Sequence, residues 1–279
     1  MFEVGLFSEI ENTSGIKFSE GNLRWILFTQ SPHQQILIDK KILSKFRHMQ
    51  MEEENHYAYF NIGSLGPREK FVSKISFKTV TRNMQFIIPK FQAEDYVGSL
   101  IQEYCKPKKY WETRDKIITS LSEQLLSTSP NMVSLLVNIF NLVQERIRFR
   151  EKQNERLGAL TAFIKREGDC DEFSDLFITL CRACRIPARR VVGIVVKNSN
   201  SFENHAWAEA YIPKSSWIPF DPALNLFAAI SSRHIARCKM GKQSDYPTRK
   251  LSWKAHKKTE KNPVKINDND VEYVKQITP

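Results

Sequence analysis

Residues 168–174 read Gly-Asp-Cys-Asp-Glu-Phe-Ser and contain the cysteine best placed to act as a nucleophile. Gly168 and Asp169 end one helical pattern, and a new series of apolar residues at helical spacing follows Cys170: Phe173, Phe177, Leu180, Cys181 and Cys184. Cys170 is therefore predicted to lie in the first turn of a helix. Unpaired N–H groups and the positive end of the helix dipole favour an anion there. We expect a lowered pKa and a reactive thiolate.

His205 and Asp221 offer a base for this thiol and an acid to orient the base. Residues 205–211 alternate large side chains with alanine, and residues 217–221 follow after a turn, so both segments are predicted to be strands. In a hairpin symmetric about Pro213, His205 and Asp221 are direct cross-strand partners, with Cβ atoms about 4.5–5.5 Å apart. The carboxylate would then hold one imidazole nitrogen while the other faces the thiol.

Four motifs in a fixed order carry a family resemblance. They read Gly-Asp-Cys-Asp-Glu, Cys-Arg-Ala-Cys-Arg-Ile-Pro-Ala-Arg, His-Ala-Trp-Ala-Glu and Trp-Ile-Pro-Phe-Asp-Pro. This order resembles the transglutaminase-like superfamily, with its papain-like Cys-His-Asp fold, strongly over residues 113–222 and weakly to Pro247. Arg185 stands where the family usually has glycine. That departure touches the end of the cysteine helix and leaves the three chemical residues in place.

The resemblance implies that Cys170 is the acyl-accepting nucleophile, that His205 is its base and that Asp221 orients the imidazole. If water resolves the thioester, the enzyme is a cysteine protease or amidase, and if an amine does, it is a crosslinking acyltransferase. The sequence has no acidic calcium-binding loop like those of the regulated animal crosslinking enzymes, so thiol-dependent hydrolysis of peptide or side-chain amides is favoured. A crosslinking transglutaminase and a non-catalytic scaffold that retains the fold are the alternatives.

A zinc site is a competing interpretation of the other cysteines. Cys181, Cys184, His234 and Cys238 have ligand-like spacings. However, the first two lie on the apolar stripe of the cysteine helix and are predicted to be core residues. The sequence therefore predicts no metal and no cofactor.

Two further residues are candidates for the same site. Trp207 shares a strand face with His205, and we expect it to bind substrate or to wall the site, although a core aromatic is an equally good interpretation. An oxyanion hole would use the Cys170 backbone N–H and a second donor, for which Gln153 is a weak candidate.

The expected fold class is α+β, with an N-terminal β-sandwich-like domain followed by a papain-like, transglutaminase-like catalytic domain. Short apolar or alternating segments predict strands at residues 24–28, 35–38, 56–62 and 71–80. No catalytic constellation occurs there, and His33, His48 and His56 are predicted to be surface residues. Prokaryotic-type members of the family carry a similar β domain, which we assign to residues 1–103.

The catalytic domain is assigned to residues 104–250. Helices are predicted from Thr113, from Asn131 and near 159–165, followed by the cysteine helix. Strands are predicted after it at residues 189–196, 205–211 and 217–221. Helices before strands is the order of papain-like folds.

The composition and charge indicate the class of protein and its partners. Hydrophobic residues make up 41% of the 279 residues, which is typical of a globular chain. No apolar stretch is long enough to cross a bilayer, and five unpatterned cysteines favour a reducing, cytoplasmic location. The net charge is +11, and residues 231–279 hold 12 basic and 5 acidic side chains. We interpret residues 251–279 as a solvated basic segment rather than a nucleic-acid-binding one, and expect a protein or peptide substrate.

Overall fold

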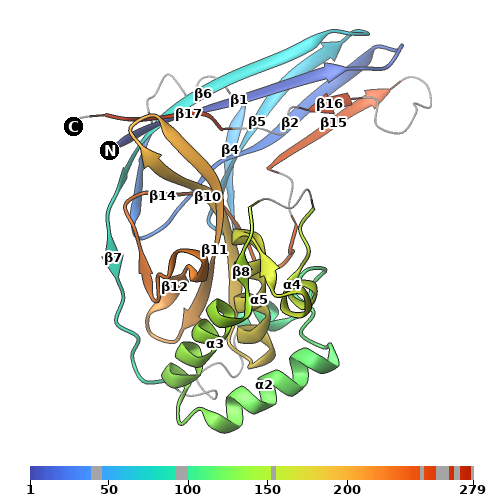
Figure 1. The fold of residues 1–279 in the computed structure, drawn as a ribbon. Coiled ribbons are helices and arrows are strands. Elements are labelled where there is room, and N and C mark those ends of the chain that lie inside the picture. The colour runs from blue at the N-terminus through green and yellow to red at the C-terminus, as the bar shows by residue number, and fades with distance from the viewer. Residues whose placement is uncertain are drawn as a thin grey trace.

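The computed structural model describes residues 1–38, 46–91, 100–151, 155–245, 248–255, 264–266 and 271–277. The fold is α+β, as predicted, and strands dominate it. Figure 1 shows long strands at one end of the molecule and the helices gathered at the other. No helix in the described part of the chain is long and apolar enough to cross a membrane.

Two antiparallel sheets form the N-terminal β-sandwich. The first sheet contains β1 (Phe2–Asn12), β3 (Gln34–Leu37), β6 (Lys70–Thr81), β16 (Val264–Ile266) and β17 (Val271–Gln276). The second contains β2 (Phe18–Thr29), β4 (His48–Glu52), β5 (Asn55–Leu65) and β15 (Arg249–Ala255). Their facing side chains, which include the buried Trp25 and Phe60, form one apolar core. The four N-terminal strands expected from the sequence are present, and β1 and β4 are additional.

The C-terminal segment contributes three of these strands. β17 pairs with β1 from Phe2 opposite Gln276 onward, β16 pairs with the far end of β1, and β15 pairs with β2. Val274 is buried opposite Val4. The interpretation of residues 251–279 as a solvated tail is therefore wrong for the parts that the structure describes. These C-terminal strands alternate charged with apolar residues, and the many charges hid the strand pattern from the sequence analysis.

A third antiparallel sheet, separate from the two of the sandwich, carries most of the candidate site. Its order is β12 (Ser216–Phe220), β11 (Ser201–Ile212), β10 (Ala188–Asn198) and β14 (His234–Met240). The first three strands were predicted, whereas β14 was not. Its Arg237 and Lys239 are polar but buried, and Lys239 Nζ lies 2.5 Å from Glu54 Oε2. β14 is buried although its sequence has no apolar pattern, because its charged side chains find partners inside the protein, and the sequence therefore did not predict it.

The helices cover one face of this sheet. They are α2 (Lys116–Thr128), α3 (Met132–Arg146), α4 (Ala159–Lys165) and α5 (Cys170–Ala183), with 3-10 turns η2 (Leu100–Cys105) and η3 (Pro222–Leu224). Asn131 caps α3 as predicted, and α2 begins after the cap Asp115, slightly later than expected. Two small ladders, β7 (Met84–Gln85) with β13 (Ala229–Ile230) and β8 (Arg148–Phe149) with β9 (Glu167–Gly168), complete the structure.

α5 is the central element of the helical core. It packs against the sheet on one side and against the other helices around it, so almost its whole length is buried. Phe177 of α5 stacks on Phe220 of β12 at a centroid distance of 4.9 Å. The opposite face of the sheet packs on the sandwich, where Cys238 of β14 meets Ile26 and Tyr57. The sheet is thus held from both sides.

Of the three N-terminal histidines predicted to lie at the surface, only His48 is exposed. His56 is half-buried and packs on Phe28. His33 is buried, with 3% of its surface exposed. It lies in the turn before β3, which packs on β14, and this burial could not be anticipated before the two domains were placed together.

Candidate functional site

Cys170 is the first residue of α5, as predicted. Asp169 is the N-cap, and a capping box with Glu172 satisfies N–H groups at this end of the helix. Glu172 also reaches the preceding loop, where its Oε1 accepts from the Leu157 N–H at 2.8 Å. Gly168 is required by this close approach, because a Cβ there would lie 2.3 Å from the Glu172 Cβ. The turn before α5 therefore fixes the position of the Cys170 side chain at the N-terminus of the helix.

The surroundings of the Cys170 thiol differ from the expectation. The backbone of Ala206, next to His205, acts to lower the pKa of the Cys170 thiol, and other groups outweigh it. Burial, followed by the charges of Asp171 and Asp169, raises the pKa of Cys170 to about 12. The predicted low pKa is thus wrong for this state of the protein, because desolvation and two carboxylates outweigh the backbone of Ala206 and the charge of Arg190, which lower the pKa. Cys170 is a neutral thiol at pH 7.

His205 and Asp221 meet, although not in the predicted register. Ile212 pairs with Ser216, so the hairpin is centred on Lys214 rather than Pro213. Asp221 consequently follows the last paired residue of β12, two positions short of the point opposite His205. Diagonal neighbours in a sheet are still within reach of long side chains, and His205 Nε2 lies 2.7 Å from Asp221 Oδ2.

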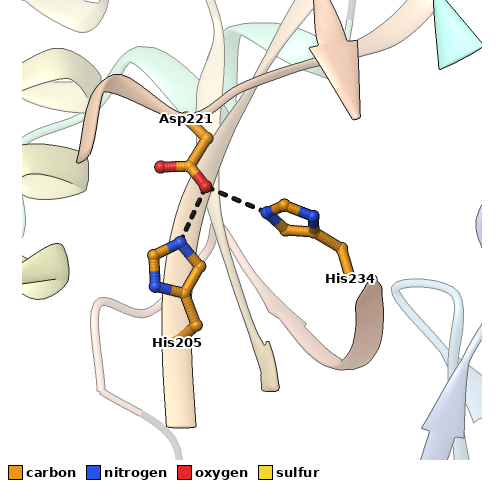
Figure 2. A group of neighbouring side chains, drawn as sticks. All are labelled: His205, Asp221 and His234. Atoms are coloured by element: carbon orange, nitrogen blue, oxygen red, sulfur yellow. Dashed lines mark hydrogen bonds and ion pairs between the residues drawn. The ribbon is translucent and has the colours of Figure 1, made fainter. Parts of the chain in front are cut away.

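The Asp221 carboxylate is the centre of a buried hydrogen-bond network (Figure 2). Its Oδ2 accepts from His205 Nε2 at 2.7 Å and from His234 Nε2 at 3.0 Å, and its Oδ1 accepts from the Leu224 N–H at 3.1 Å. Burial alone would raise the pKa of Asp221, but the hydrogen bonds from the two histidines hold it at about 2. Asp221 is therefore an anion at neutral pH, and the Nδ1 of His205 remains available on the other side of the ring.

Cys170 and His205 line the same cleft. Its volume is about 720 Å³, and its apolar wall includes Phe149 and Phe202. Phe149 is 57% exposed, which is unusual for such a large apolar side chain. Val271 of β17 also lines the cleft, so the sandwich contributes to it. A volume of this size lies within the range of ligand-binding clefts, about 300–1,000 Å³.

The comparison with family models agrees with this geometry. Residues 119–222 match the model of the transglutaminase-like superfamily, and the match includes Cys170, His205 and Asp221. This segment is a transglutaminase-like domain.

Solved structures extend the likeness beyond the transglutaminase-like domain. A structure from Cytophaga hutchinsonii, described as a "Putative Cysteine Protease", is 17% identical with a TM-score of 0.61, and the match covers 98% of this chain and 97% of that one. The likeness in fold therefore includes the sandwich as well as the segment that matches the family model. The periplasmic domain of TgpA from Pseudomonas aeruginosa matches over 79% of this chain and 90% of that chain, at 12% identity and a TM-score of 0.46.

One sequence relative is the uncharacterized protein YebA of Bacillus subtilis (strain 168). It is 26% identical over 145 residues, which cover 43% of this chain and 20% of that protein. The chain thus spans about a fifth of the length of this curated relative.

Trp207 lies behind the histidines of the transglutaminase-like domain rather than in the cleft. It is 1% exposed and packs with Val191 and Ala236. Its ring is stacked with that of His205 at 6.2 Å and meets His234 edge-on at 5.2 Å. The predicted contact with substrate is therefore not possible in this structure, and the alternative interpretation, a core aromatic, describes it. Both faces of β11 are covered, which alternation alone did not reveal.

The zinc alternative is not supported by the geometry. Within the described ranges, the groups with metal-ligand spacing are His205 with Asp221 and His234, and Asp169 with Cys170 and Asp171. Neither group contains Cys181, Cys184 or Cys238. Cys181 and Cys184 are buried in the helical core, and Cys238 is buried beneath the sandwich.

Sequence reasoning missed the role of His234 as a neighbour of Asp221, because β14 was not predicted. Only its spacing to Cys238 drew attention, and for a different chemistry. Gln153, the weak candidate for an oxyanion donor, lies outside the described residues. The structure brings His205 and Asp221 together and sets Cys170 on the same cleft, while the catalytic roles assigned to them stay predictions.

Proposed function

We propose that this protein is a thiol-dependent amide hydrolase in which Cys170 is the nucleophile, His205 the general base and Asp221 the residue that orients the base. The observation that carries the proposal is the 2.7 Å hydrogen bond between His205 Nε2 and Asp221 Oδ2 on a cleft that Cys170 also lines. Because the acceptor is a carboxylate, the proton of the neutral ring is on Nε2, which leaves a lone pair on Nδ1 for the thiol proton.

In the proposed reaction, Cys170 Sγ attacks the amide carbonyl carbon while His205 Nδ1 takes the thiol proton. The carbon–nitrogen bond then breaks, the same proton passes to the leaving amine, and a thioester remains on the sulfur. Water attacks the thioester, which releases the acid and restores the thiol. The Cys170 backbone N–H, at the start of α5 where the helix offers no internal acceptor, would stabilise the oxyanion.

The raised pKa of Cys170 decides the form of this mechanism. A thiol with a pKa of about 12 is not a preformed thiolate at pH 7. Proton transfer to His205 must therefore accompany the attack, as in general-base catalysis, which typically contributes about 10²–10⁴-fold to a rate. The pairing of His205 with Asp221 would stabilise the imidazolium that forms.

The proposal is tested first without a substrate, by the rate at which iodoacetamide alkylates individual cysteines at pH 7.5. Peptide mass spectrometry follows Cys170 and, in the same digest, Cys105, which is also half-buried and whose pKa burial raises to about 11. We expect Cys170 to react faster than Cys105, and His205→Ala to slow it by at least about tenfold without changing Cys105. A Cys170 rate that is unaffected by His205→Ala would refute the assignment of the base.

Substrate screening then separates hydrolysis from transfer. Casein peptides are incubated with the protein, with and without a fluorescent primary amine, and analysed by mass spectrometry. Hydrolysis predicts cleaved peptides or side-chain amides converted to acids, each abolished by Cys170→Ala and retained in Cys105→Ala. Incorporation of the amine would instead favour a crosslinking acyltransferase. The cytoplasmic location stays a prediction from the cysteine content.

A further inference from the structure

We infer that His234 is a positioning residue for the same reaction: it holds the Asp221 carboxylate so that Asp221 in turn holds His205. The inference rests on the proposed function. It extends the Cys-His-Asp arrangement to a fourth side chain, contributed by β14, which binds the same carboxylate oxygen as the base.

The contact is specific and buried. His234 Nε2 lies 3.0 Å from Asp221 Oδ2, the same oxygen that accepts from His205 Nε2. The His234 side chain is 1% exposed, and its Nδ1 is buried without a hydrogen-bond partner among the described residues. Burying an unsatisfied ring nitrogen is costly. Among the described residues, the polar contact of the His234 side chain is therefore with Asp221.

The backbone around His234 is fixed from several sides. The His234 N–H donates to the Ser231 carbonyl at 3.0 Å, and its carbonyl lies 3.3 Å from His33 Nε2 in the sandwich. Gln34 forms two hydrogen bonds with the backbone of Ala236, at 2.8 and 3.0 Å. These contacts fix the position of the His234 backbone, and hence of its Cα, independently of Asp221. The imidazole is thus a fixed donor to which the carboxylate is drawn.

The ring itself has little freedom. Trp207 meets the His234 ring edge-on and stacks with the His205 ring, so one indole supports both imidazoles. The His205 and His234 rings are themselves inclined at 68° with centroids 5.7 Å apart. Asp221 Oδ2 is therefore located by two donors of fixed direction (Figure 2). Without His234, the carboxylate would keep the His205 ring and the Leu224 N–H as donors, and Oδ2 would be positioned by His205 alone.

Two amide substitutions distinguish donation from bulk. The Nε2 of glutamine reaches the position of the histidine Nε2, whereas the Nδ2 of asparagine reaches only the position of Nδ1. His234→Gln therefore keeps the donor to Asp221, and His234→Asn, its matched control, loses it. The readout is the rate of iodoacetamide alkylation of Cys170 at pH 7.5, with Cys105 as the internal reference and the thermal midpoint of each variant recorded.

We expect His234→Gln to react like the wild type and His234→Asn to react about tenfold more slowly, the scale on which loss of a residue that orients a functional histidine is felt. In a His205→Ala background, His234→Asn should have no further effect, because His234 acts through His205. A merely structural role would lower the rate in both backgrounds.

Other outcomes separate this inference from the proposed function. If His205→Ala slows Cys170 but both His234 variants react normally, the positioning role is wrong and the proposed function stands. If His205→Ala has no effect, the proposed base is wrong and the positioning role is wrong with it. If His234→Asn does not fold, His234→Leu replaces it as the variant without a donor: a tenfold loss in His234→Leu with His234→Gln unaffected supports the inference, and normal reactivity of His234→Leu overturns it.

Discussion

Burial of His33 should make the stability of the protein depend on pH in a defined window. His33 is 3% exposed, with Nδ1 2.9 Å from Ser31 Oγ and Nε2 3.3 Å from the His234 carbonyl. Burial is the largest cause that lowers the pKa of His33 from 6.5 to about 4. The perturbation is His33→Gln, which retains an N–H near the position of Nε2 but does not titrate.

The sign and size of the effect follow from the two pKa values. The unfolded chain binds a proton at His33 near pH 6.5, and the folded protein only near pH 4. Between these values the unfolded state binds more protons, so the free energy of unfolding falls as the pH is lowered. Each unit of difference between the two pKa values is worth about 1.4 kcal/mol, so the free energy of unfolding falls by about 3 kcal/mol in all. About 2 kcal/mol of this loss has occurred when the pH reaches 5.

The measurement is urea-induced unfolding of the wild type and of His33→Gln, followed by tryptophan fluorescence at pH 7.5, 6 and 5. We expect the wild type to lose about 2 kcal/mol more than His33→Gln between the highest and lowest pH. Parallel losses in the two proteins would refute the reasoning. So would an imidazole titration of His33 near its ordinary pKa in the folded protein, measured by NMR.

Two further predictions concern the backbone of β10 and the C-terminal end of α5. Gly193 of β10 lies between β11 and β14, and a Cβ there would meet the Ile235 carbonyl oxygen at 2.1 Å. Gly193→Ala should therefore destabilise the protein by about 1–3 kcal/mol, measured by thermal unfolding. The control Gly15→Ala should not, because a Cβ at Gly15 meets nothing within 4 Å. Arg185 is exposed and has a φ of +63° at the end of α5; Arg185→Gly should raise the stability by up to about 1 kcal/mol, whereas Arg185→Ala, which leaves the strain, should not.

The parts of the site that the sequence predicted are those determined by local chemistry. The start of α5 at Cys170 followed from Gly168 and Asp169, which end one element and cap the next. The strands that carry His205 and Asp221 followed from alternation and from the turn between them. The departure at Arg185 was located correctly at the end of the cysteine helix, where the structure shows a left-handed residue.

The parts that were missed depend on contacts between distant segments. One residue of difference at the centre of the turn moved Asp221 away from the position opposite His205, and side-chain length compensated. His234 lies on a strand whose charges are paired internally, so its sequence did not resemble a strand. The pKa of Cys170 was predicted from the helix dipole alone, because burial and the orientation of Asp171 are not readable before the fold is known.

The pairing of β1 with β17 has a consequence for how the protein folds. Phe2 lies opposite Gln276, so this ladder joins residues separated by nearly the whole chain, and the entire transglutaminase-like domain is inserted between the strands of the sandwich. The entropy of closing so long a loop must be overcome before the ladder contributes any stability, and high contact order slows folding. We therefore expect the last strands to dock late, after the inserted domain has collapsed and brought the ends together. Val271, which lines the cleft, belongs to that late-docking strand, so the cleft would be completed only in the final step of folding.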